Sequence, residues 1–416
     1  MARRTYAAYG ISWLTDFVGG LMVFTVTRSL AEQSSGTLFM GLISGGFAAT
    51  FSLSTFFSGR IADRLGYTRM IITATLLLFP CFLCAALVDS NNPLFYLAYI
   101  LAGGALGMVY PPTVAWLTLA DRGPILMKKL TGFCVAWNLG IISGQVVGSQ
   151  LFGEWGHSTA LTCAICFLPL NLLLVAWGNK TGPNSSHFVA DNEQPEMHDH
   201  LVKLAAAFAV ISWVANVGGT FSMSTIFFLL PELVVQIGIT PKHQGGIMAL
   251  SRVVVITIYL LMAISHRWRF RLTSILCSQA LGVLGLLYLA TAHNEIELIV
   301  GLVIFSILPA YNYFASLLYS TVGSTAQQRG TWCGIHEATF GVGLTFGSIL
   351  GGCIGNYAGV RSCFQLAAVV VSILAMVQII LYLKIVLPLR TSIAKHTSQA
   401  SSDDPPFDEM TGQVGS

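Results

Sequence analysis

The sequence predicts an all-α integral membrane protein with twelve transmembrane helices arranged as two pseudo-symmetric six-helix bundles. Charged residues make up 9% of the chain and apolar residues 54%, whereas soluble domains carry roughly 25% charged residues. Twelve apolar segments are each about as long as the roughly 20 helical residues that cross a bilayer. Two similar stretches also begin at residues 11 and 211. These observations exclude a water-soluble fold, because too few polar residues are available to cover its surface.

The apolar segments define the predicted helices in chain order. A helix pairs its own backbone groups, which lipid cannot do. In the first half the segments cover residues 6–28, 37–58, 70–88, 94–118, 131–153 and 159–178. In the second half they cover residues 204–235, 244–265, 272–291, 297–321, 332–355 and 362–387. Pro111, Pro231 and Pro309 lie within three of them and are predicted to bend them, because proline leaves a carbonyl unpaired.

Composition divides the chain into four parts. Residues 1–178 are predicted to form the N-terminal bundle and residues 204–387 the C-terminal bundle. Between them, residues 179–203 are polar and contain two prolines, so a flexible cytoplasmic linker is expected. Residues 388–416 have the composition of a disordered cytoplasmic tail.

Basic residues predict the orientation, because Lys and Arg accumulate on the cytoplasmic side of membrane proteins. With the N-terminus inside, only Arg28, Lys242 and Arg361 of the 21 basic residues fall outside, and Arg252 lies within a helix. We therefore expect both termini to be cytoplasmic. The compact loops are typical of a bacterial protein, so we expect the plasma (inner) membrane.

An internal repeat relates the two halves. "ISWLTDFVGG" begins at Ile11 and "ISWVANVGGT" at Ile211, so that Asp16 corresponds to Asn216. A second pair of similar segments is "GIISGQVVG", which begins at residue 140, and "GLTFGSILG", which begins at residue 343. Both carry the GxxxGxxxG spacing, which lets a neighbouring membrane helix approach closely. The repeat predicts a central site between two bundles.

The segment between the second and third predicted helices, "GRIADRLGYTR" at residues 59–69, carries the most specific motif. It resembles the signature loop of the major facilitator superfamily, whose pattern is Gly-x-Leu-Ala-Asp-Arg-x-Gly-Arg-Lys/Arg. Matching residues are Gly59, Ala62, Asp63, Arg64 and Gly66. Tyr67 stands where a basic residue is usual, and Arg69 supplies a charge nearby.

The resemblance implies two bundles that rock about a midplane site and expose it to each side in turn. It also implies a cytoplasmic gate, in which Asp63 latches against the start of helix eleven. A carboxylate near a helix N-terminus meets a partial positive charge, which favours such a latch. The predicted gate residues are Gly59, Asp63, Arg64, Gly66 and Arg69.

Two positions depart from the drug/proton antiporters of this superfamily. Those proteins typically carry an arginine in helix four and a Gly-Pro pair in helix five. Here Tyr99 stands at the arginine position, and Gly144 is followed by Gln145. Proton-driven drug export by that route is therefore not predicted.

Ionisable residues within membrane helices are the first candidates for a site, because burying a charge in lipid is costly. Asp16 lies near mid-depth and either contacts the solute or fixes helix packing by a polar bond. Arg252 either pairs with Asp16 or Glu337, or attracts an anionic group through its guanidinium fork. Further polar candidates for contact with the solute are Asn216, Asn138, Gln145, Tyr110 and Asn312.

The resemblance implies a secondary active transporter that moves a small organic solute by rocker-switch alternating access, and Arg252 favours an anionic one. The alternative is a non-transporting receptor or scaffold with the same fold. No catalytic constellation or metal-ligand cluster is present, so neither an enzyme nor a cofactor or metal is expected. Expected partners are the solute, the lipid bilayer and a coupling proton carried by Asp16 or Glu337. Nucleic acid is not expected, and the chain is expected to be a monomer.

Overall fold

The computed structural model describes residues 2–118, 121, 123–179 and 195–400, and every regular element among them is helical. The first half comprises α1 (Ala2–Glu32), α2 (Thr37–Leu65), α3 (Tyr67–Leu87), α4 (Pro93–Gly107), α5 (Tyr110–Thr118) and α6 (Gly123–Asn179). The second half comprises α7 (Pro195–Ser224), η1 (Thr225–Leu229), α8 (Leu230–Gln236), α9 (Pro241–Ile264), α10 (Leu272–Thr291), α11 (Glu295–Phe305), α12 (Ile307–Val322), η2 (Ala326–Gln328), α13 (Arg329–Ala358), α14 (Arg361–Leu381), η3 (Tyr382–Val386) and α15 (Leu387–Ala400).

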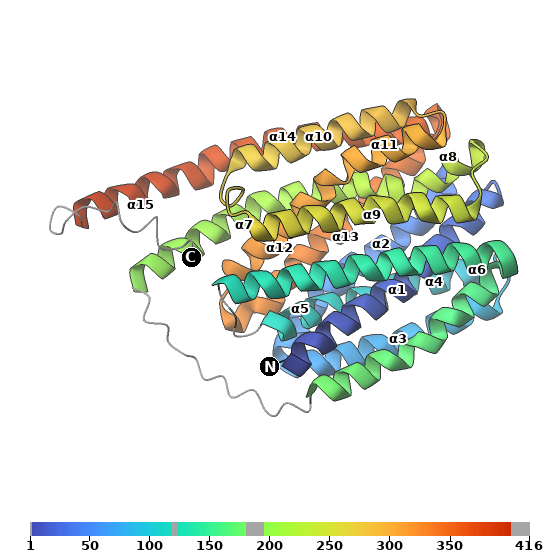
Figure 1. Cartoon of the computed structure of the whole chain (residues 1–416), viewed down its shortest axis with the longest axis horizontal. Coiled ribbons are helices and arrows are strands. Elements are labelled where there is room, and N and C mark those ends of the chain that lie inside the picture. Colours follow the sequence, from blue (N-terminus) through green and yellow to red (C-terminus); the bar gives the residue numbers. More distant parts are fainter. Residues whose placement is uncertain (1, 119–120, 122, 180–194, 401–416) are drawn as a thin grey trace.

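Twelve membrane crossings are present in the described part of the chain. Eleven continuous helical segments are long and apolar enough to span a bilayer. One of them, α6, has 57 residues and contains Gly156 at φ 78° and ψ −175°, a conformation outside the helical region. The chain reverses there, so α6 consists of two antiparallel arms, coloured teal and green in Figure 1. Counting both arms gives the predicted twelve.

Three crossings are interrupted at the predicted prolines. The ring of a helical proline clashes with the carbonyl four residues earlier. Four residues before Pro111 is Gly107, where α4 ends, and four residues before Pro309 is Phe305, where α11 ends. The π-helical segment η1 immediately precedes α8, which contains Pro231 near its start. Crossings four and ten, at equivalent places in the two halves, are therefore both broken helices.

Glycines set how the first helix of each half packs. A Cβ at Gly144 of α6 would lie 2.3 Å from the carbonyl oxygen of Phe17 in α1, and one at Gly343 of α13 would lie 2.5 Å from that of Val217 in α7. Phe17 and Val217 occupy matching places in the repeat, so Gly144 and Gly343 do too. The two GxxxGxxxG motifs thus lie on equivalent helices, as predicted, but the motif that starts at Gly140 begins one helical turn earlier than the one that starts at Gly343.

Two segments expected to lack structure are partly helical. Helix α7 already begins at Pro195, because proline is well tolerated at the first helical position. Helix α15 continues the last crossing to Ala400. Its Arg390 donates hydrogen bonds to the hydroxyl of Tyr382, at 3.1 Å, and to the carbonyl of Phe270, which fixes its first turn. The rest of the expected linker and tail, residues 180–194 and 401–416, lies outside the described residues.

The two halves meet most extensively where α2 runs antiparallel to α13. Midway along this pair, the hydroxyl of Ser52 donates to the carbonyl of Ala338 at 2.9 Å. We call the end of the molecule where α1 begins and α2 finishes, on the left in Figure 1, the Asp63 end. The opposite end, where α1 finishes and α2 begins, is the Arg28 end.

Candidate functional site

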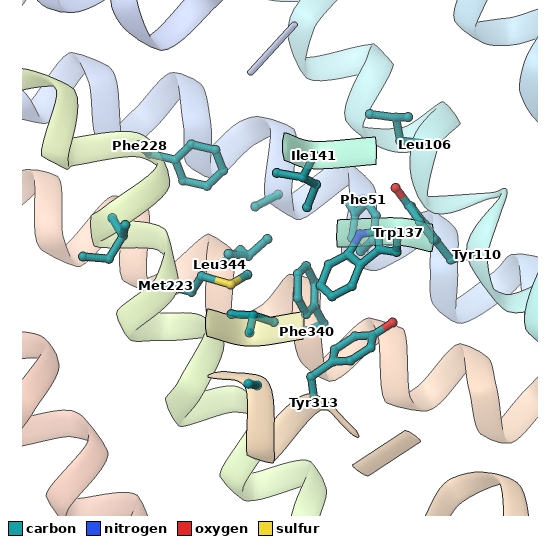
Figure 2. Close-up of a cluster of buried hydrophobic side chains, with 14 of the residues drawn as sticks. Phe51, Leu106, Tyr110, Trp137, Ile141, Met223, Phe228, Tyr313, Phe340 and Leu344 are labelled. Carbon is teal, nitrogen blue, oxygen red and sulfur yellow. The ribbon is translucent and has the colours of Figure 1, made fainter. Parts of the chain in front are cut away.

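A cavity lies between the two halves, beside the middle of α1. Its volume is about 90 Å³, which is room for about six to nine water-sized spheres. Aromatic and aliphatic side chains from both halves form most of its wall, and Figure 2 shows Phe51, Phe228, Phe340 and Leu344 among them. Four of the predicted site residues also line it: Asp16, Tyr110, Arg252 and Glu337.

Asp16 of α1 is paired with a tyrosine from the broken fourth crossing. The hydroxyl of Tyr110 donates to Asp16 Oδ1 at 2.7 Å, and Asp16 is 5% exposed. The Trp137 side chain, on the first arm of α6, also interacts favourably with this carboxyl. Among the described residues, however, none makes a well-aligned hydrogen bond to Asp16 Oδ2. This buried oxygen is therefore only partly satisfied, by the Trp137 side chain.

Glu337 of α13 forms a second carboxyl–tyrosine pair on the other side of the cavity. The hydroxyl of Tyr313, from the broken tenth crossing, donates to Glu337 Oε1 at 2.7 Å. The ring of Trp137 stacks on that of Tyr313 with centroids 4.8 Å apart, as Figure 2 displays. Trp137 thus lies between the two pairs and links the halves.

The two carboxyls sit on non-equivalent helices of the repeat. Asp16 in α1 corresponds to Asn216 in α7. Asn138 lies six residues before Gly144, and Glu337 lies six residues before Gly343, so these two also correspond. Each half therefore carries one acid and one amide, but the acid is on the first helix in one half and on the fifth helix in the other.

Arg252 of α9 lies in the cavity wall without an acidic partner. Its guanidinium carbon is 4.2 Å from the ring centroid of Phe227 and 6.0 Å from that of Trp137. Its Nη2 donates to the sulfur of Met223 at 3.5 Å. Within the described part of the chain, no carboxylate oxygen comes within 4.0 Å of it, although Asp16 attracts it through space. The alternative of a direct ion pair with Asp16 or Glu337 is therefore not what the structure contains.

Four predicted residues do not line the cavity: Asn138, Gln145, Asn216 and Asn312. The amide nitrogen of Asn312 donates to the carbonyl of Ala215 at 2.9 Å, and its oxygen accepts from Gln279 at 3.1 Å. Asn216 donates to the hydroxyl of Thr339 at 3.1 Å. These amides join neighbouring helices, because a polar group in lipid gains most from a partner inside the protein.

The other two amides belong to the first arm of α6. Asn138 donates to the carbonyl of Cys134, one turn earlier, at 2.8 Å. Gln145 is 1% exposed and sits where α6 lies against Gly20 of α1. Both side chains lie between packed helices and do not line the cavity. The prediction that they contact the solute therefore does not agree with this structure.

The Asp63 end is closed by a bond network between α2 and α13. Asp63 Oδ1 accepts from the backbone nitrogen of Gly330 at 3.2 Å, and Oδ2 accepts from the nitrogen and the hydroxyl of Thr331, each at 2.9 Å. These are unpaired groups of the α13 N-terminus. The hydroxyl of Tyr67 donates to Asp63 Oδ1 at 3.0 Å, so the residue that departs from the motif supports the same carboxyl. A Cβ at Gly59 would lie 2.3 Å from the Gly330 carbonyl oxygen.

The remaining gate candidates lie around this network. Gly66 adopts φ 101° between α2 and α3, a conformation that favours glycine. Arg64 and Arg69 are both exposed to solvent. Arg329 instead donates from Nη1 to the carbonyl of Thr118 at 3.0 Å, adding a second link between the halves.

The halves are joined at the Arg28 end as well, through contacts that no sequence motif predicted. Buried Arg28 of α1 donates to the side-chain oxygen of Gln244 at 2.8 Å and to the carbonyl of Ile239 at 3.4 Å. Its Nε pairs with Glu32 at 2.7 Å. A Cβ at Gly41 of α2 would lie 2.4 Å from the carbonyl oxygen of Ser348 in α13. Contacts between the halves therefore cross both ends of the molecule.

Three residues of this arrangement were missed: Trp137, Phe227 and Arg28. Trp137 directly precedes a candidate amide, which was a usable signal, whereas nothing distinguishes Phe227 among 25 phenylalanines. Arg28 was predicted at the outer end of the first helix, and it is in fact only 5% exposed, with α1 continuing to Glu32. Tyr99, at the position of the antiporter arginine, stacks on Phe47 with centroids 4.6 Å apart. The residue at that position therefore packs against Phe47 of the apolar cavity wall and supplies no charge.

Comparison with known proteins identifies relatives. The family model described as Major Facilitator Superfamily matches residues 6–331. Multidrug resistance protein MdtH of Yersinia enterocolitica is 23% identical over 303 residues, covering 71% of each chain. Multidrug resistance protein 2 of Bacillus subtilis is 24% identical over 330 residues, covering 75% of this chain and 79% of that one.

Two solved structures share the fold. The human organic anion transporter MFSD10 (TETRAN) aligns with a TM-score of 0.67 and 14% identity, over 91% of this chain and 99% of that one. The proton:xylose symporter XylE, bound to 6-bromo-6-deoxy-D-glucose, aligns with a TM-score of 0.66 and 14% identity, over 90% and 94%. At this identity the likeness shows the fold alone.

Proposed function

Because the chain belongs to the major facilitator superfamily, we propose that it is a secondary active transporter that moves a small organic anion across a membrane. The observation that supports an anionic solute is Arg252. This buried cation lies in the cavity wall, with no carboxylate within 4.0 Å among the described residues. A buried charge without a partner is costly. A ligand carboxylate, sulfonate or phosphate would supply the partner, and the guanidinium fork suits all three.

The proposed transport cycle uses the two closures in turn. Residues 1–178 and 204–387 would rock as two bundles, releasing the Asp63 network to open one side and the Arg28 network to open the other. Both networks consist of a few hydrogen bonds between α1 or α2 and the second half, so each is weak enough to break during a cycle. The proposed gate therefore includes Arg28 and Gln244 in addition to Gly59, Asp63, Arg64, Gly66 and Arg69.

The proposal extends to orientation and coupling. The excess of basic residues beside the Asp63 end supports cytoplasmic termini in a plasma (inner) membrane. Asp16 and Glu337 are the proposed carriers of a coupling proton, since both are buried carboxyls that line the cavity. A monomer is proposed because one chain contains the whole cavity.

A thermal-shift screen of the purified full chain tests the anion. Anionic, neutral and cationic compounds of one size are compared on wild type, Arg252→Ala and the charge-retaining Arg252→Lys. A compound at a hundred times its Kd should stabilise wild type by about 2.7 kcal/mol. Anions should lose this effect in Arg252→Ala and keep part of it in Arg252→Lys. Equal stabilisation of wild type and Arg252→Ala by every class would contradict the proposal.

Uptake into proteoliposomes separates transport from the receptor or scaffold alternative. A compound that stabilises the protein should also accumulate inside the vesicles, or exchange across them, in a protein-dependent way. Binding without any movement would favour the non-transporting alternative.

A further inference from the structure

We infer that the solute carries, beside its anionic group, a hydrogen-bond donor that binds Asp16, either a hydroxyl or an ammonium group. This inference rests on the proposed function, because it concerns the second recognition group of the same cavity. It divides the site into an anion subsite at Arg252 and a donor subsite at Asp16, within walls that are otherwise mostly apolar.

The donor subsite is indicated by an incomplete hydrogen-bond set. Asp16 Oδ1 is occupied by the hydroxyl of Tyr110 at 2.7 Å, while Oδ2 is buried and lacks a well-aligned donor from the described residues. A buried acceptor that has lost water is costly until it receives a hydrogen bond. Asp16 lines the cavity, but Oδ2 itself has almost no accessible surface in this arrangement, so a donor on the solute would take the place of the poorly aligned Trp137 contact to reach it.

The position of Arg252 separates the two subsites. Asp16 belongs to α1 of the first half, whereas Arg252 belongs to α9 of the second half and is held over the ring of Phe227. Arg252 and Asp16 line the same cavity without forming an ion pair. A molecule with an anionic group at one end and a donor near it would complete both subsites and connect the two halves.

The walls define the body of the molecule. Phe51, Phe340 and Trp137 present ring faces and edges to the cavity, and Leu344 and Ile141 add aliphatic surface (Figure 2). A volume of about 90 Å³ admits roughly six to nine water-sized units. The solute class is therefore a small hydroxy or amino acid with an apolar or aromatic side group.

A matched series of three ligands tests the inference. Phenylacetate, mandelate and phenylglycine share a phenyl ring and a carboxylate, and differ only in bearing hydrogen, hydroxyl or ammonium at the α-carbon. Isothermal titration calorimetry on the full wild-type chain in detergent should give mandelate or phenylglycine a Kd about tenfold or more below that of phenylacetate. Tighter binding than phenylacetate by mandelate alone identifies the donor as a hydroxyl, and tighter binding by phenylglycine alone identifies it as an ammonium group.

Variants assign the gain to one carboxyl. Asp16→Asn should reduce the preference for the donor-bearing ligand to about threefold or less, while phenylacetate still binds. Glu337→Gln removes the other cavity carboxyl, whose Oε1 accepts from Tyr313 as Asp16 Oδ1 accepts from Tyr110, and it tests the competing assignment: a preference kept within about twofold of wild type assigns the donor to Asp16.

The outcomes distinguish this inference from the proposed function. If the three ligands bind wild type equally and all depend on Arg252, the donor subsite is overturned and the anion transporter stands. If none depends on Arg252, the proposed function fails first. A preference that persists in Asp16→Asn but disappears in Glu337→Gln would also overturn the assignment to Asp16. The wild-type series alone is decisive should a variant not fold.

Discussion

The guanidinium of Arg28 donates a 2.8 Å hydrogen bond to the side-chain oxygen of Gln244, and this bond joins the first half of the chain to the second. It lies at the opposite end of the α2–α13 pair from the bonds of Asp63 to Gly330 and Thr331. The two networks thus join the halves at both ends in one structure, and each can be tested separately.

Arg28→Ala should favour opening at the Arg28 end. The variant leaves the buried Gln244 oxygen without its donor, at a cost of about 1–3 kcal/mol to the closed arrangement. Spin labels on the exposed positions Gln33 and Gln236, one in each half, should report a longer distance in a background without native cysteines.

Lys242→Ala is the control for this end. Lys242 pairs with Glu154 across the same halves at 2.8 Å, but both side chains are more than 40% exposed. Exposed pairs contribute about 0–1 kcal/mol, so the distance distribution should not change. An Arg28→Ala distribution identical to wild type would rule out the Arg28 closure.

Asp63→Ala should slow transport without abolishing ligand binding. The carboxylate accepts hydrogen bonds at the start of α13, and loss of such a cap costs about 0.5–2 kcal/mol. Uptake rates should fall, while the Kd of a cavity ligand stays within about threefold. Arg60→Ala removes an exposed charge of α2 outside the proposed gate and should transport nearly normally; equal defects in both variants would assign the effect to the loss of surface charge.

Alanine at closely packed glycines should oppose closure at one end only. A Cβ at Gly59 would meet the carbonyl oxygen of Gly330, and one at Gly41 would meet that of Ser348. Because backbone cannot move aside as a side chain can, Gly59→Ala should favour opening at the Asp63 end and Gly41→Ala at the Arg28 end. Gly246→Ala, with no atom within 4 Å of the new Cβ, is the control. Labelling of cysteines introduced at each end measures the bias, and a matching bias in the control would contradict this explanation.

Asn312→Ala should reduce stability and leave recognition unchanged. Hydrogen bonds between membrane helices contribute about 0.6 kcal/mol on average and up to about 1.7, and Asn312 makes three, with Ala215, Ser278 and Gln279. The melting temperature should fall while the Kd of the ligand is retained. Arg252→Ala should instead weaken ligand binding and leave the melting temperature of the ligand-free protein nearly unchanged. A large change of Kd in Asn312→Ala would show that Asn312 contributes to the binding site after all.

The fold was largely predictable from sequence, because hydropathy and helix length determine the crossings almost independently of tertiary contacts. The breaks at Pro111 and Pro309 followed from the chemistry of proline in the same way. The helical start at Pro195 and the extension to Ala400 did not. Both lie in polar sequence, where local capping and the contacts of Arg390 decide the structure.

The candidate site was predictable where charge was the signal. Asp16, Arg252 and Glu337 stand out because ionisable groups are rare in membrane helices. Amides do not stand out in this way, since Asn312 and Gln145 are equally polar whether they face a cavity or a neighbouring helix. Trp137 and Phe227 form the wall only through tertiary packing, which no local pattern specifies.

The contact of Ser52 with Ala338 has a mechanical consequence for the proposed rocking. If this contact is the fulcrum of the α2–α13 pair, the arm to Gly41 is about 16 Å long and the arm to Gly59 about 10 Å, at 1.5 Å per residue. One tilt would then displace the Arg28 end roughly one and a half times as far as the Asp63 end. Because the two arms differ in length, the opening at the Asp63 end would be the narrower of the two. That opening would limit the size of the solute that can cross.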